Sequence, residues 1–136
     1  MRIGALVLWI ANACIGLYLL SIWLLRGGIR RQATKVTRFP IGLIFMHPLF
    51  AAAGLGFWVA YVLSGRVRWA WIAFGILCVA ALLGFALLTR WLTGRGGRHA
   101  REAEQRFPRY AVLLHALVGV ATFVLVLVTA TIVSHS

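Results

Sequence analysis

Residues 38–47 read RFPIGLIFMH, and residues 106–115 read RFPRYAVLLH, a second copy with a changed middle. In both copies an arginine and a phenylalanine precede a proline, and a histidine follows that proline after six intervening residues. Because proline is favoured at the start of a helix, each copy predicts a helix that carries a histidine about two turns from its beginning. The recurrence predicts an internal tandem repeat, with repeat 1 over about 3–63 and repeat 2 over about 67–133.

The two cysteines of the chain extend the repeat upstream. Cys14 lies twelve residues before Arg26, and Cys78 lies twelve residues before Arg90. The repeated unit is therefore a helix that carries a cysteine, followed by a helix that carries a histidine.

The composition places these helices in a membrane. The chain has 136 residues, of which 62% are hydrophobic and only two are acidic, and its mean hydropathy is +0.94. A helix of about 20 apolar residues crosses a bilayer core of roughly 30 Å. We therefore expect one all-α integral membrane domain over residues 1–136, a four-helix transmembrane bundle, with spans at about 3–25, 41–63, 69–92 and 109–133.

The net charge of +12 does not indicate nucleic-acid binding, because it is confined to two segments. Eleven of the fourteen basic residues lie in segments 26–38 and 90–109. This bias predicts that both segments are cytoplasmic loops and that the N- and C-termini lie outside, as in a bacterial plasma-membrane protein. Four aromatic residues near the short outer turn predict an interfacial belt: Trp58, Tyr61, Trp69 and Trp71.

A repeated two-helix unit predicts a pseudo-twofold axis along the membrane normal, with the site of interest on that axis. His47 and His115 would then lie at one depth, roughly 10 Å below the cytoplasmic helix ends. Cys14 and Cys78 would face each other in a second layer nearer the midplane. Small residues on the histidine faces, namely Ala51, Gly54 and Gly119, would leave space beside the imidazoles.

Two histidines on diagonal helices at one depth suggest the axial ligands of a b-type haem. This arrangement resembles cytochrome b561-like proteins and the haem-binding anchors of complex II, in which helices two apart share a haem. The resemblance covers the four-helix arrangement and the histidine pair. A haem held by this pair would make the chain an electron-transfer subunit between a cytoplasmic-side partner and the quinone pool. Its propionates would point to the near, arginine-rich side, toward Arg38, Arg106 and Arg109.

Three other hypotheses stay open on the sequence. His47, His115, Cys14 and Cys78 are the ligand types of a Rieske-like [2Fe–2S] cluster, although the usual local motifs of such a cluster are absent. Each histidine would alternatively hold its own chlorophyll-type pigment. In the third hypothesis there is no cofactor, and the chain is an accessory subunit of a larger membrane complex. No soluble-enzyme motif is present, so enzymatic activity by the chain alone is not expected.

Overall fold

The computed structural model describes residues 1–33, 40–93 and 107–135, with the side chains of 31–33 excepted. Its long helices are α1 (Arg2–Leu25), α3 (Ile41–Ser64), α4 (Val67–Thr93) and α5 (Arg109–Ser134). All four are long and apolar enough to cross a membrane. The expected spans are confirmed to within two residues at either end, because uninterrupted apolar runs of this length leave few other structures available in a bilayer.

The helix ends follow local backbone chemistry. Pro40 and Pro108 are the N-cap residues of α3 and α5, each with an extended ψ that turns the chain into its helix. Gly65 ends α3 in the left-handed conformation, at φ +67°, and starts the tight turn into α4. Such a conformation is strained for residues that carry a Cβ atom.

One short helix, α2 (Gly28–Ala33), was not expected from the sequence. It follows Gly27, whose φ is +78°, and it folds back against the end of α1. A Cβ atom on Gly28 would overlap the indole of Trp23, so only glycine allows this close approach. Because α2 has six residues and little hydrophobic periodicity, pattern reasoning placed it within a loop.

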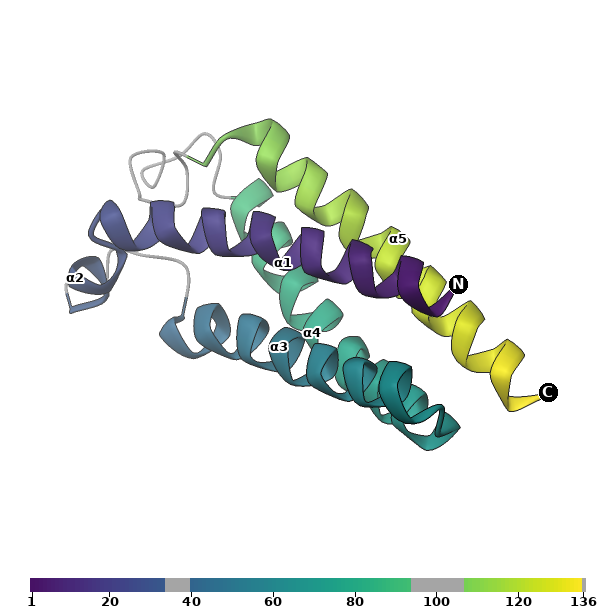
Figure 1. Ribbon diagram of the computed structural model, residues 1–136. Coiled ribbons are helices and arrows are strands. Elements are labelled where there is room, and N and C mark those ends of the chain that lie inside the picture. Colours follow the sequence, from purple (N-terminus) through teal and green to yellow (C-terminus); the bar gives the residue numbers. More distant parts are fainter. Residues whose placement is uncertain (34–39, 94–106, 136) are drawn as a thin grey trace.

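The four long helices form a ring of neighbours. The two most extensive contacts are those of α3 with α4 and of α1 with α5. Smaller contacts of α1 with α3 and of α4 with α5 complete the ring. α1 and α4 are therefore one diagonal pair, and α3 and α5 are the other. Both termini lie at the same end of the bundle as the α3–α4 turn (Figure 1). The order of the helices around the ring is the one that a twofold exchange of the two repeats requires, while the symmetry itself stays a prediction.

Two apolar clusters fill the bundle interior. One, near the termini, is centred on Trp9, Trp58 and Val126, and the other, near the opposite end, on Trp23, Ile44 and Trp91. The outer faces of the helices carry large exposed aliphatic side chains throughout. Only 11–17% of the most apolar window of each long helix is buried within the chain, so the rest of this surface faces lipid or another protein.

The predicted aromatic belt is only partly right. Trp71 is 40% exposed, whereas Trp58 is fully buried and Tyr61 is only 3% exposed. The Trp58 indole donates a hydrogen bond to the carbonyl of Arg2 at 3.1 Å and thereby ties α3 to the start of α1. Sequence proximity to a turn identified the level of these residues but not the face of the helix on which they lie.

Candidate functional site

A polar layer separates the two apolar clusters, and His47 is its first member. It lies on α3, six residues after Ile41, and is half-buried. Its Nδ1 atom is 2.9 Å from the carbonyl oxygen of Ala80 on α4. A carbonyl only accepts, so Nδ1 carries the proton and donates it, and Nε2 keeps its lone pair. This is the tautomer and the kind of orienting contact that metal-binding histidines use.

His115 occupies the corresponding position on α5, six residues after Arg109. Its ring is half-buried and packs on α1 at Gly16, where a Cβ atom would lie 3.0 Å from Cε1. The ring of His47 packs in the same way on α4 at Gly84, where a Cβ atom would lie 2.8 Å from its Cε1. Each imidazole therefore depends on a glycine of the neighbouring helix for its place.

The two histidines meet across the bundle, as expected from the repeat. Their ring centres are 6.1 Å apart and their planes are perpendicular. An imidazole nitrogen binds a first-row metal ion at about 2.0–2.1 Å, so two imidazoles on opposite sides of one ion place their ring centres roughly 6.3 Å apart. The separation in the structure is close to that value.

Asn12 is the third polar member of the layer, on α1 one turn before Gly16. Its Oδ1 atom and the Nδ1 atom of His115 are both buried, and neither has a hydrogen-bond partner in the described part of the chain. The amide nitrogen of Asn12 lies against Gly119, where a Cβ atom would come within 3.2 Å. Two unpaired polar atoms on neighbouring helices mark this side of the layer as incompletely satisfied.

The small residues expected to clear space beside the imidazoles have other neighbours. Trp9 fills the space beside Gly54, where a Cβ atom would lie 2.9 Å from its indole. The same indole donates a hydrogen bond to the carbonyl of Ala51 at 3.2 Å. Together with the contact of Gly119 to Asn12, this assigns the predicted small residues to close helix packing. The glycines that face the imidazoles are Gly16 and Gly84, which the sequence did not single out.

The cysteines do not join the histidines. Cys14 is exposed and Cys78 is half-buried. Among the described residues, no three of the histidine, cysteine, aspartate and glutamate side chains come together. The expectation that Cys14 faces inward is wrong for a helical reason. At about 100° per residue, Cys14 lies roughly 200° from both Asn12 and Gly16, and therefore on the opposite face of α1.

The structure describes one of the three arginines proposed for propionate contacts. Arg109 is exposed at the first residue of α5. Arg38 and Arg106 lie outside the described residues. A different polar group is buried between the polar layer and the loop end of the bundle. The indole Nε1 of Trp23, seven residues after Gly16, has no hydrogen-bond partner among the described residues, and the residue is 1% exposed.

The internal repeat could have identified Gly16 and Ala80, which the sequence analysis did not select. Gly16 follows Cys14 by two positions, and Ala80 follows Cys78 by two. Positions equivalent in the repeat thus provide the contacts of the two imidazoles on α1 and α4. A comparison of the helix faces within the repeat would have identified Gly16 and Ala80 ahead of the cysteines.

The fold and the site define an integral membrane four-helix bundle with a histidine pair in its interior. No protein-family model, curated protein or solved structure matches the chain.

Proposed function

We propose that the chain is a membrane electron-transfer subunit that holds one b-type haem between His47 and His115. The observation that carries this proposal is the geometry of the pair. Two imidazoles from diagonal helices lie 6.1 Å apart, and one of them donates its Nδ1 proton to a main-chain carbonyl. Haem bound in this way supplies one-electron redox chemistry.

The roles of the protein groups follow from their places in the layer. His47 would be the ligand with the fixed ring, because Ala80 orients it. His115 would be the second ligand; its ring hydrogen-bonds the main chain of Asn12, while its Nδ1 has no partner among the described residues. Trp23 offers a buried N–H donor roughly 10 Å nearer the loop end than Gly16, a direction suited to a propionate carboxylate. Arg109 would add positive charge at that end.

The apolar clusters on either side of the layer would exclude water from the redox centre and keep its surroundings at low polarity, which tunes its potential. Electrons would pass between a partner on the side of the basic loops and the quinone pool. The exposed apolar faces leave room for further subunits of a complex. The exposure of Cys14 disfavours the Rieske-like cluster, and the mutual approach of the histidines disfavours one pigment on each.

A second candidate function is that of an accessory subunit without a cofactor. The contacts of Trp9 with Gly54 and of Asn12 with Gly119 favour it, because protein side chains already occupy the space beside the small residues of the histidine-bearing helices. In that case His47 serves only as a hydrogen-bond donor that ties α3 to α4. The two functions differ in whether the purified protein contains iron.

The test is an absorption spectrum of protein purified in mild detergent from its native host, oxidised and then reduced. We expect a sharp reduced α-band and close to one haem per chain. His47→Ala and His115→Ala should each abolish the band, since a bis-histidine site needs both imidazoles. His135→Ala is the matched control, because His135 is exposed at the end of α5 and should leave the spectrum unchanged.

Cys14→Ser combined with Cys78→Ser separates haem from a cluster. A haem held by the histidines should survive this double substitution, whereas a Rieske-like cluster would lose the thiolates of one iron. Wild-type protein that contains neither haem nor non-haem iron would refute the redox proposal and leave the accessory function.

A further inference from the structure

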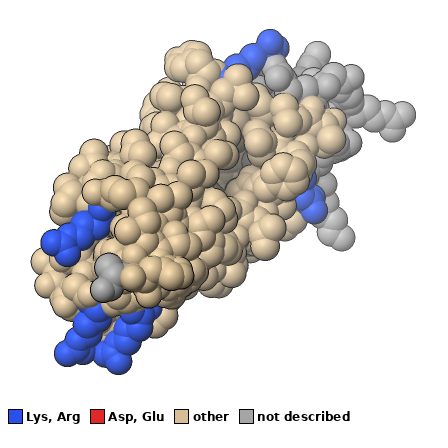
Figure 2. All heavy atoms as spheres, turned by 90° about the vertical axis from the view of Figure 1, so that its right-hand side faces the viewer, with Lys and Arg blue, Asp and Glu red and all other residues tan. Residues whose placement is uncertain are grey.

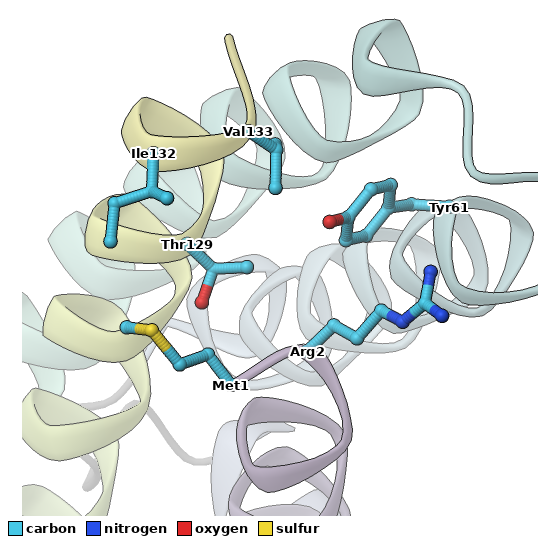
Figure 3. Close-up of a pocket in the computed structure, with 6 residues that line it drawn as sticks. All are labelled: Met1, Arg2, Tyr61, Thr129, Ile132 and Val133. Atoms are coloured by element: carbon cyan, nitrogen blue, oxygen red, sulfur yellow. The ribbon is translucent and has the colours of Figure 1, made fainter. Parts of the chain in front are cut away.

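A cavity of about 300 Å³ lies at the end of the bundle that carries the termini. The first turn of α1 and the last turns of α3 and α5 surround it (Figure 3). By residue counting it is about 21 Å along the helices from the histidines, since Tyr61 and Thr129 each follow a histidine by fourteen positions. The cavity is therefore a site separate from the polar layer. Its lining residues are Met1, Arg2, Tyr61, Thr129, Ile132 and Val133.

Tyr61 presents an unpaired donor to this cavity. The residue is only 3% exposed, and its ring packs on Trp58 at a centroid distance of 5.0 Å. In Figure 3 its hydroxyl points into the space between the three helices. This hydroxyl makes no hydrogen bond to the described part of the chain, and it is not one of the side-chain atoms that are shut off from solvent, so it opens to the cavity. The donor is therefore available to an acceptor on a ligand that enters the cavity.

The electrostatics of the cavity favour an anion. Arg2 is the first residue of α1, whose N-terminus has no side-chain cap and no acidic residue in its first turn. The free N–H groups and the helix dipole therefore add to the charge of the Arg2 guanidinium. Trp58 holds this turn against α3 through its bond to the Arg2 carbonyl. Figure 2 shows basic side chains on this face.

The position of the cavity selects the kind of anion. It opens where membrane-spanning helices end, which is the level of lipid headgroups. Ile132, which is 52% exposed, and Val133 continue the lining along the apolar side of α5, where an acyl chain would lie. A zwitterionic headgroup would bring its own cation toward Arg2. We propose that the cavity binds the phosphate of an anionic phospholipid, with Tyr61 and Arg2 as the hydrogen-bond donors.

The test is native mass spectrometry of the detergent-solubilised protein with phosphatidylglycerol or phosphatidylcholine. We expect one phosphatidylglycerol per chain and no comparable retention of phosphatidylcholine. Tyr61→Phe keeps the ring but removes the donor, so it should weaken retention roughly tenfold or more, as should Arg2→Gln. Arg68→Gln is the control, because Arg68 lies at the same end but over the ring of Trp69, outside the cavity lining.

Three outcomes would overturn the proposal. Equal retention of the two lipids would show that no anion is selected, and an equal loss in Arg68→Gln would show only a general effect of charge. Displacement of the lipid by inorganic phosphate at matched concentration would identify a free-phosphate site instead. Gel filtration shows whether Tyr61→Phe has kept the folded bundle. Its haem content, expected to be unchanged, keeps this test independent of the redox proposal.

Discussion

Gly84 lies beneath the ring of His47, and its replacement by alanine should destabilise the bundle. A methyl group at this position would lie 2.8 Å from His47 Cε1 and 3.3 Å from Nδ1, so the ring would have to move. The ring is held by its 2.9 Å hydrogen bond to Ala80, one turn earlier on the same helix. Relief of the overlap therefore stretches or breaks that bond.

The size of the effect can be isolated with Gly75→Ala, a matched change on the same helix. A Cβ atom on Gly75 would have no neighbour within 4 Å. Both substitutions gain about 1 kcal/mol of intrinsic helix propensity, so this gain cancels when they are compared. The remaining difference is the cost of crowding in a packed interior, about 1–3 kcal/mol. Loss of the Ala80 bond alone would account for about 0.5–1.5 kcal/mol of it.

The assay is unfolding of the detergent-solubilised protein by a rising fraction of sodium dodecyl sulfate, followed by far-UV circular dichroism. We expect Gly75→Ala to be as stable as wild type or more stable, and Gly84→Ala to be less stable than Gly75→Ala by the amount above. Equal stability of the two variants would refute the placement of His47 against α4. The assay needs no cofactor, so it tests the geometry of the site and not its occupant.

Two further predictions concern the packing and the topology. Trp9→Phe should lower the free energy of unfolding by about 0.5–1.5 kcal/mol, because it removes the indole donor to the Ala51 carbonyl. The exposed Trp71 gives the control Trp71→Phe, which should change little in the same titration, and equal effects would contradict the inferred bond. A reporter fused after Ser136 should be active only outside the cytoplasm, because eleven of fourteen basic residues lie in segments 26–38 and 90–109, which are predicted to be cytoplasmic. A cytoplasmic reporter signal would reverse the assigned orientation.

The helices and the histidine pair could be predicted from the sequence because each leaves a long-range signal. Apolar runs of bilayer length specify spans, and the repeated proline-to-histidine spacing specifies that two imidazoles share a depth. Ala80 could not be identified in this way, because it acts through a main-chain carbonyl, which every residue has. The close approach of Gly28 to Trp23 depends on how α2 folds back, and six residues carry too little pattern to predict that.

Helix faces were the weaker part of the prediction. Cys14 was assigned to the interior from its depth alone, although its angular distance from Gly16 places it on the lipid side. Tyr61 was assigned to the interface for a similar reason, and it is a core residue that lines a cavity. The depth of a residue can be counted along the sequence. The face of the helix that is buried depends on the neighbouring helices, and the sequence pattern does not identify it when all sides of the helix are apolar.

The polar layer carries a cost that simple helix packing would avoid. A buried polar atom without a partner costs roughly 1–3 kcal/mol, and Asn12 Oδ1 and His115 Nδ1 are two such atoms in the described chain. The second repeat shows that an apolar residue is tolerated here. Ile76 of α4 occupies the position that Asn12 has in α1, and α4 is also long and apolar enough to cross a membrane. If the bundle required only helix packing, aliphatic residues in place of Asn12 and His115 would make it more stable. Under the proposed function, a bound cofactor would complete this layer.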